Sequence, residues 1–332
     1  MKKQKAVLTI PVRGLWLFQV KSDLENSVLR EVSRSFYLTL RLLPKPMRAG
    51  ASLGYLLART SDTLADAAGV SHDVRRQCLG QFAQAVAGGA GVPRWPIYLL
   101  NSLPNRSERR LLECAGEILD WLKCLPEAEA RLVREVVATI ISGQTLDLER
   151  FGNADRDHVV TLCDDGTLED YAWRVAGCVG AFWTRLGFLT MGNRFSTMPE
   201  DLLLEKGIAY GKGLQLVNIL RDLADDLHVG RCYIPVGNPH DAEELLATHR
   251  HWSGRAEEWI SSGVEYAELL GSRRLRAATV LPALIAQKTL FAIRSATWET
   301  LQTRIKVPRS AVYRLLLRSF FQSAYPRMKS KD

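Results

Sequence analysis

The sequence lacks long apolar runs, paired cysteine motifs and glycine-rich nucleotide loops, and each absence argues against a class of protein. No run of about 18 apolar residues is present, so we expect no membrane span. The six cysteines show no C-x-x-C spacing and the six histidines form no H-E-x-x-H motif, which argues against zinc and favours buried thiols in a reducing cytoplasm. P-loop, G-x-G-x-x-G, nucleophile-elbow and nucleic-acid-binding motifs are missing too. We therefore expect no nucleic acid partner.

Alternating strand patterns are also missing, whereas helix-period patterns run through most of the chain. The predicted helices cover about 23–44, 46–67, 71–87, 106–123, 126–149, 199–228, 241–268, 270–304 and 308–323, and a further helix begins at Thr167. A Gly/Pro-rich loop over 88–104 is the clearest break. It is not treated as a domain boundary, because two acidic helix faces lie on opposite sides of it. The sequence predicts one all-α domain over 23–323, between an N-terminal segment, 1–22, and a basic tail, 324–332.

The composition fits a globular protein that binds an anionic partner. At 47% hydrophobic and 24% charged residues, the chain can bury a sizeable core. The net charge of +8 suits a phosphorylated substrate or an anionic membrane surface. The basic start, Met1 to Lys5, precedes a short, interrupted apolar segment without a small-residue cleavage site, so we predict neither a signal peptide nor an anchor.

Acidic side chains gather on one face of the predicted helix over 199–228. Asp222 and Asp226 lie about 40° apart around the axis and about 6 Å apart along it, so their carboxylates can converge on the same ions. Arg221 and Arg231 lie close by in the sequence. Mg²⁺ takes hard oxygen ligands of this kind while it also binds phosphates. Taken alone, such a pattern is more often a solvated acidic helix end.

A second acidic pair repeats this spacing on the predicted helix over 46–67. Asp62 and Asp66 are four residues apart, and Arg59 precedes them by one turn. Two acidic helix faces, each with an arginine beside it, favour a site for a diphosphate ester.

Other segments carry weaker signals. Ser33, Arg34 and Ser35 offer donors that suit phosphate oxygens, although helices often carry such residues on solvated faces. Asp147 lies one turn after Gly143 and is either a polar group near a cavity or a surface residue.

A helix that begins near Thr167, the predicted N-cap, carries Tyr171 in its first turns and small residues after it. Ala176 and Gly180 allow close approach either of another helix or of a hydrocarbon chain, and the spacing fits both. Tyr171 is expected to point its phenol toward whatever lies there.

From Asp23 to Val307 the chain resembles the squalene and phytoene synthase family, the trans-head-to-head isoprenoid synthases. The matching segments are Ser33-Arg-Ser-Phe36, Asp62-x-x-x-Asp66, Tyr171 to Gly180, Gln215 to Asp222 and Asp222-x-x-Asp-Asp226. The resemblance implies the prenyl-synthase fold with a central apolar cavity, several Mg²⁺ ions, and farnesyl or geranylgeranyl diphosphate as substrate.

The resemblance also implies the roles of individual residues. Metal binding and catalysis fall to Asp62, Asp66, Asp222 and Asp226, with Tyr171 as a further catalytic residue. Substrate binding falls to Ser33, Arg34, Ser35, Phe36, Tyr55, Arg59, Val175, Ala176, Gly180, Gln215, Asn218, Arg221, Arg231 and Arg304. A non-Rossmann NADPH site would use Asn218, Arg221 and Arg231.

In the implied reaction, two farnesyl diphosphates condense head to head through presqualene diphosphate to squalene. Mg²⁺ and the arginines neutralise the leaving diphosphate, and an apolar lining that includes Leu216 excludes water from the allylic cation. Tyr171 or the released diphosphate takes the proton lost on cyclopropane closure, and hydride from NADPH ends the reaction.

The branch of the family is less sharply marked. Ser33-Arg-Ser-Phe36 and Thr184-Arg-Leu186 are closer to squalene synthases, whereas Cys232-Tyr-Ile-Pro235 is closer to phytoene and dehydrosqualene synthases. The alternatives are therefore a phytoene, dehydrosqualene or hydroxysqualene synthase, or an inactive relative acting as an assembly factor. Terpene cyclases typically carry Asp-Asp-x-x-Asp, and the first motif here lacks the adjacent second aspartate.

The predicted last helix, 308–323, is basic and rich in Leu and Phe. It either binds anionic membranes reversibly or packs on the body of the protein. We expect a cytoplasmic protein, with peripheral contact at the inner face of the membrane under the first alternative.

Overall fold

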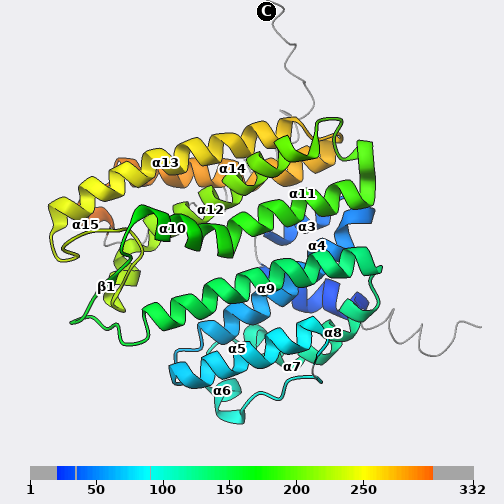
Figure 1. Cartoon of the computed structure of the whole chain (residues 1–332), viewed down its shortest axis with the longest axis horizontal. Coiled ribbons are helices and arrows are strands. Elements are labelled where there is room, and N and C mark those ends of the chain that lie inside the picture. The colour runs from blue at the N-terminus through cyan, green and yellow to red at the C-terminus, as the bar shows by residue number, and fades with distance from the viewer. Residues whose placement is uncertain (1–20, 34–35, 90, 302–332) are drawn as a thin grey trace, which may run out of the picture.

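The computed structural model describes residues 21–33, 36–89 and 91–301, and this part of the chain is almost entirely helical (Figure 1). The elements are η1 (Leu24–Val28), α2 (Leu29–Ser33), α3 (Phe36–Leu42), α4 (Lys45–Ala65), α5 (His72–Ala87), α6 (Ile97–Ser102), α7 (Arg106–Glu113), α8 (Ala115–Lys123), α9 (Glu127–Arg150), β1 (Val160–Thr161), α10 (Asp165–Ala172), η2 (Trp173–Gly177), α11 (Cys178–Met191), η3 (Gly192–Arg194), α12 (Glu200–His228), β2 (Arg231–Cys232), α13 (Ala242–Glu268), α14 (Arg273–Arg294) and α15 (Trp298–Leu301). The all-α prediction is confirmed. The predicted helix over 308–323 and both predicted terminal segments lie largely or wholly outside the described residues.

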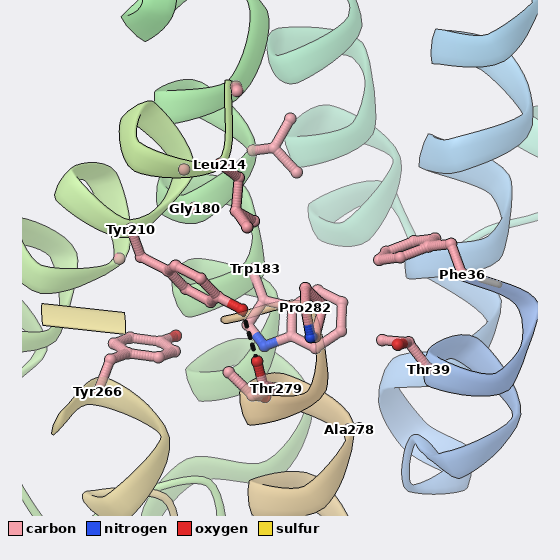
Figure 2. Close-up of a pocket in the computed structure, with 14 residues that line it drawn as sticks. Phe36, Thr39, Gly180, Trp183, Tyr210, Leu214, Tyr266, Ala278, Thr279 and Pro282 are labelled. Carbon is pink, nitrogen blue, oxygen red and sulfur yellow. Dashed lines mark hydrogen bonds between the residues drawn. The ribbon is translucent and has the colours of Figure 1, made fainter. Parts of the chain in front are cut away.

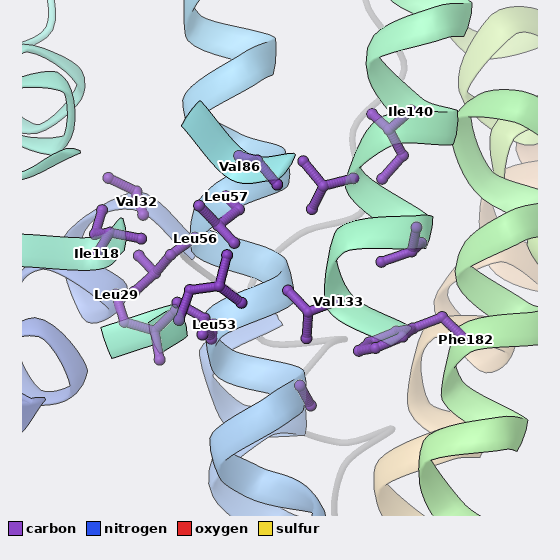
Figure 3. Close-up of a cluster of buried hydrophobic side chains, with 14 of the residues drawn as sticks. Leu29, Val32, Leu53, Leu56, Leu57, Val86, Ile118, Val133, Ile140 and Phe182 are labelled. Carbon is purple, nitrogen blue, oxygen red and sulfur yellow. The ribbon is translucent and has the colours of Figure 1, made fainter. Parts of the chain in front are cut away.

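Helix α9 lies between two groups of helices. In Figure 1, α5 to α8 lie below it and α10 to α14 above it, and α9 packs against α4, α5 and α11. Its apolar residues at helical spacing are buried, for example Val133, Val137 and Ile140. Figure 3 shows Val133 between Leu53 of α4 on one side and Phe182 of α11 on the other. Burial of this stripe therefore holds both groups to one central helix.

The second core cluster forms around α12, α13 and α14. Its centre includes Leu216 and Leu220 of α12, Trp252 and Ile260 of α13, and Leu290 of α14, all of them almost completely buried. Each of these side chains removes enough apolar surface from water to contribute roughly 1.5 to 3 kcal/mol. The long helices of the second half of the chain are thereby packed side by side.

Two glycines allow α11 and α12 to cross in close contact. A Cβ atom at Gly180 would lie 1.8 Å from the backbone oxygen of Gly207. Because real Cβ atoms never approach a carbonyl oxygen so closely, only glycine fits at position 180 without a shift of the helix. These two glycines therefore allow close helix packing, and they also line a cavity.

Several local predictions were wrong at element ends. The Gly/Pro-rich loop contains the short helix α6, and the predicted helix over 106–123 breaks at Cys114 into α7 and α8. Thr167 is not the N-cap: the carboxylate of Asp164 accepts hydrogen bonds from both the backbone N–H and the hydroxyl of Thr167. An ionised carboxylate is a stronger acceptor than a hydroxyl for the free N–H groups of a first helical turn. Asp164 is therefore the N-cap, three residues before the predicted position.

A very short parallel pair of strands was not predicted. Residue Val160 of β1 pairs with Arg231 of β2, and the backbone N–H of Val160 donates to Gly230 O at 2.9 Å. Gly230 has φ of 81°, and a Cβ atom there would lie 2.3 Å from the carbonyl oxygen of Asp155. This left-handed turn is open to glycine and strained for other residues. It ends α12 and directs the chain into Arg231.

None of the helices in the described part of the chain is both long and apolar enough to cross a bilayer.

Candidate active site

A cavity of about 160 Å³ lies between α3, α11, α12, α13 and α14. Its walls are formed by Phe36, Thr39, Ala176, Val179, Gly180, Trp183, Gly207, Tyr210, Gly211, Leu214, Tyr266, Ala278, Thr279 and Pro282. In Figure 2, Phe36 and Thr39 face Tyr210 and Tyr266 across the cavity. The tyrosine hydroxyls are already occupied, since Tyr210 donates to Thr279 O at 2.8 Å and Tyr266 shares a hydrogen bond of 2.7 Å with Thr184. The lining is therefore mostly apolar and suits a hydrocarbon chain, although Trp183 Nε1 and Thr279 Oγ1 are buried there without a hydrogen-bond partner.

Three of the predicted substrate-binding residues, Phe36, Ala176 and Gly180, lie on this wall. The expectation that Leu216 lines the cavity was wrong. Leu216 is completely buried in the core around α13, and Leu214 reaches the cavity instead. Two helix positions differ by about 200° around the axis, so Leu214 and Leu216 face opposite sides of α12.

The first acidic pair lies at the end of α4. Gln144 of α9 donates a hydrogen bond to Asp62, and Arg59 lies 3.8 Å from the same carboxylate. Burial and the charge of Asp66 raise the pKa of Asp62 to about 7. The pKa of Asp66 is also raised by burial, against the opposing effect of Arg231 and Arg59. Many protein atoms lie around both carboxylates, but water still reaches them, since the side chain of Asp62 is 42% exposed and Asp66 is exposed. Contact with water limits how far burial can raise the two pKa values.

The second acidic pair lies near the end of α12. Arg221 binds Asp222 through two nitrogens, with Nε donating to Oδ1 at 2.8 Å and Nη2 donating to Oδ2. Burial and the charge of Asp222 raise the pKa of Asp226 to about 7, while Arg231 opposes this rise. Like charges on successive turns of one helix thus destabilise each other until a cation arrives.

Arg231 brings the two acidic pairs into one electrostatic neighbourhood. Its charge acts on Asp66 of α4 and on Asp226 of α12. The two acidic faces therefore lie near the same guanidinium, although more than 150 residues separate them in the sequence.

The described residues contain no group of three or more carboxylate, imidazole or thiol side chains that could hold a metal ion unaided. Mg²⁺ is usually bound by one or two carboxylates together with waters and substrate phosphates. The two acidic pairs, in which burial raises the pKa values of Asp62, Asp66 and Asp226, fit that mode of binding. They are suited to Mg²⁺ ions that are coordinated by a bound diphosphate as well as by the carboxylates.

Tyr233 and Asp147 extend the site beyond the predicted residues. The Tyr233 hydroxyl donates to Asp147 Oδ2 at 2.9 Å, and Arg231 Nη1 lies 3.5 Å from the same oxygen. The ring of Tyr233 stacks on the ring of Tyr171, with centroids 5.0 Å apart. Burial, followed by the charges around it, raises the pKa of Tyr171 well above its usual range, so Tyr171 carries a neutral hydroxyl. Tyr171 lies with these polar groups and is not among the residues that line the cavity.

The sequence left Asp147 undecided, and Tyr233 was predicted only as part of the Cys232-Tyr-Ile-Pro235 segment, with no role at the site. The sequence does contain a signal, because Asp147 follows Gln144 by three residues and Gly143 by four, on one face of a helix with apolar residues elsewhere. Burial of the Asp147 side chain, which is 14% exposed, excludes the surface alternative.

The remaining predicted residues lie in several different surroundings. Ser33 is buried and donates to Leu29 O at 2.5 Å, and Tyr55 donates to Val32 O while its ring stacks on Phe36. Arg59 also donates to Glu108 at 2.6 Å. Val175 packs against α9 at Gly143, Gln215 is partly buried and Asn218 is exposed. Arg34, Ser35 and Arg304 lie outside the described residues.

Comparison with known proteins gives a consistent result. Residues 29–311 match the family described as squalene/phytoene synthase. The chain is 30% identical over 239 residues to a presqualene diphosphate synthase of Zymomonas mobilis, which covers 69% of this chain and 67% of the relative. It is 27% identical over 236 residues to a bifunctional lycopene cyclase/phytoene synthase of Phaeosphaeria nodorum, covering 68% of this chain and 37% of the relative, so it spans little more than a third of that protein.

A solved structure shares the fold. The complex structure of TcSQS with the ligand E5700 superimposes with a TM-score of 0.73 at 20% identity, covering 92% of this chain and 88% of the other.

Proposed function

Because the chain belongs to the squalene/phytoene synthase family, we propose that it condenses two farnesyl diphosphates head to head in a Mg²⁺-dependent reaction. Presqualene diphosphate is the proposed first product, and squalene, formed with NADPH, the proposed final product. The first step is supported by similarity to a protein named for that product.

The observation that carries the proposal is that one helix serves both halves of a prenyl diphosphate. Leu214 of α12 lines the apolar cavity, and Asp222 follows eight residues later on the same helix. At 1.5 Å per residue the two positions are about 12 Å apart along the axis. A diphosphate at Asp222 can therefore extend its hydrocarbon chain along α12 into the cavity.

At the acidic end, Asp62, Asp66, Asp222 and Asp226 would hold Mg²⁺, which supplies charge neutralisation for a departing diphosphate. Arg231, whose pKa is held above its usual value by neighbouring acidic groups despite the opposing effect of burial, stays charged beside them. Arg59 lies beside Asp62 and adds positive charge at the other acidic pair. The chain's own cations thus complement the anion that the reaction releases.

At the apolar end, the lining protects an allylic cation from water. Trp183, Tyr210 and Phe36 present ring surfaces to the cavity, and aromatic faces attract a cation by roughly 1 to 2 kcal/mol. Tyr171 is neutral and lies with the polar groups. Its hydroxyl can therefore accept a proton from the substrate only while it donates its own proton to another group. The hydroxyl of Tyr233, whose ring stacks on Tyr171, is the adjacent acceptor.

The second step uses NADPH beside the same end of α12. Asn218 is exposed there, and Arg221 and Arg231 carry positive charge that suits a phosphorylated cofactor. Both guanidinium groups are engaged by carboxylates of the chain, so NADPH would bind beside these ion pairs.

Product analysis tests the proposal. Purified protein is incubated with farnesyl or geranylgeranyl diphosphate, with and without Mg²⁺ and with and without NADPH. We expect presqualene diphosphate or its unreduced products from farnesyl diphosphate and Mg²⁺ alone, and squalene once NADPH is added. The same hydrocarbon with and without NADPH would assign the chain to the phytoene or dehydrosqualene branch, and no product from either diphosphate would contradict the proposal.

A further inference from the structure

Arg231 is fixed at a point where acids from three helices meet. Its backbone is held by the pairing of β2 with β1 and by the left-handed turn at Gly230. Its charge acts on Asp66 of α4, Asp147 of α9 and Asp226 of α12. Because the backbone of Arg231 is held in place, only rotation of its side chain decides which of these three carboxylates the guanidinium pairs with.

Among the residues described by the structure, the ion pair that Arg231 forms within 4 Å is with Asp147, at 3.5 Å. Asp147 is well enclosed, with 14% of its side chain exposed, whereas Asp66 is exposed. A carboxylate that has lost its water gains more from a cation than one that water still reaches. The preference of Arg231 for Asp147 thus has a physical cause.

Asp147 is itself held in place. Its Oδ2 atom accepts the hydroxyl of Tyr233, whose ring is stacked on Tyr171 and lies edge to face with Phe151. Its Oδ1 atom is buried without a hydrogen-bond partner. A carboxylate in this position can hold a cation without moving toward the metal-binding acids.

We propose that Asp147 is a positioning residue that draws Arg231 away from Asp66 and Asp226 and so leaves the motif aspartates free to bind Mg²⁺. The inference rests on the proposed function, because it assigns Mg²⁺ and diphosphate to that site. Without the Asp147 charge, Arg231 turns to Asp66 or Asp226 and competes with Mg²⁺ for the same oxygens. Mg²⁺ binding then weakens although none of its proposed ligands has changed.

The test measures binding rather than turnover. Mg²⁺ is titrated into the full-length protein at fixed inorganic pyrophosphate, and pyrophosphate binding is followed by calorimetry. In Asp147→Asn, which keeps the shape and an acceptor for Tyr233, we expect the Mg²⁺ concentration at half-saturation to rise roughly three- to tenfold, the scale of one partly buried ion pair. Glu149→Gln is the matched control, because Glu149 is exposed on the same helix and removal of its charge should shift nothing.

A double variant separates this role from direct ligation of the metal by Asp147. If Asp147 acts through Arg231, Asp147→Asn should not raise the Mg²⁺ requirement further once Arg231→Gln is present. A rise of the same size in the Arg231→Gln background would overturn the inference in favour of Asp147 as a ligand. Asp147→Glu returns the charge and should restore the wild-type requirement, and its failure to do so would show that charge is not what matters.

Failure of the inference is distinguishable from failure of the proposed function. Suppose that wild-type protein binds pyrophosphate only with Mg²⁺, and that Asp147→Asn keeps both the wild-type melting temperature and the wild-type Mg²⁺ concentration at half-saturation. This result would overturn the role of Asp147 and leave the proposed function intact. Wild-type protein that shows no Mg²⁺-dependent pyrophosphate binding would contradict the metal site and thus the proposed function itself.

Discussion

The cavity and the acidic end share helix α12 but are packed in opposite ways. Around the cavity, backbone meets backbone at Gly180 and Gly207, and the hydroxyls of Tyr210 and Tyr266 are paired within the chain. At the acidic end, carboxylates lie beside carboxylates, and burial together with repulsion raises the pKa values of Asp62 and Asp226 to about 7. The cavity end is thus held together by close packing, whereas the acidic end carries carboxylate repulsion that the proposed Mg²⁺ would relieve.

The largest expected effect comes from removing a motif carboxylate. Asp62→Asn should lower turnover with farnesyl diphosphate roughly a hundredfold or more, the scale of one lost electrostatic group. Its melting temperature without Mg²⁺ should hold or rise, because repulsion from Asp66 is relieved. Asp222→Asn should lose as much activity, but its melting temperature should not rise, since Asp222 forms a two-point ion pair with Arg221. Full turnover in both variants would mean that the acidic end is only surface.

Removal of the Tyr171 hydroxyl should have the next largest effect. Tyr171→Phe keeps the ring that stacks on Tyr233 and deletes only the oxygen. If the hydroxyl takes part in proton transfer, kcat should fall roughly ten- to hundredfold with little change in KM. Steady-state kinetics measure both constants. An unchanged kcat would leave the diphosphate as the proton acceptor.

The contact between α11 and α12 can be broken without touching a charge. Gly180→Ala should destabilise the protein by about 2 to 3 kcal/mol, because the new methyl group meets the backbone oxygen of Gly207 and the helices must separate. Denaturant unfolding measures this. Gly80→Ala is the matched control: Gly80 is exposed in α5 with no atom within 4 Å of an added Cβ, so alanine there should stabilise by about 0.5 to 1 kcal/mol. Equal effects at both positions would contradict the close crossing.

The smallest expected effect is a pH dependence confined to the acidic end. With a folded-state pKa of about 7 for Asp62, above its ordinary value, the folded protein binds more protons than the unfolded chain between about pH 4 and 7. This group's stabilisation is therefore lost as pH rises through 7. Protons also compete with Mg²⁺, so Mg²⁺ affinity should weaken several-fold from pH 8 to pH 6. Calorimetry at both pH values, with Asp62→Asn showing a reduced difference, checks the assignment.

Features that depend on neighbouring residues in the sequence were predicted well. The helix-period patterns identified α4, α5, α9, α12 and α13 nearly to the residue, and the four-residue spacing of the acidic pairs indicated their shared faces. These signals are local, because helix geometry alone places residues i and i+4 on one side.

Features that depend on the meeting of distant segments were not predicted. Thr279 and Pro282 of α14 line the cavity, but nothing in their own segment indicates a cavity. Asp147 becomes part of the site only because β2 and the residue that follows it bring Arg231 and Tyr233 to α9. The strand pair that does so is two residues long, too short to leave an alternating pattern in the sequence.

The wide turn η2, between Tyr171 and Gly180, has a consequence for how much the chain tolerates insertions and deletions. In η2 the backbone N–H of Cys178 donates to Trp173 O, five residues back, so this turn holds one residue more than a regular α-helical turn. The extra residue sets the rotation between Tyr171 on the polar side and Ala176 and Gly180 on the cavity wall. Deletion of one residue from η2 would allow a regular helix but turn one part against the other by about 100°. A regular helix in place of η2 would therefore change the rotation of Tyr171 relative to Gly180 and turn them away from their present surroundings.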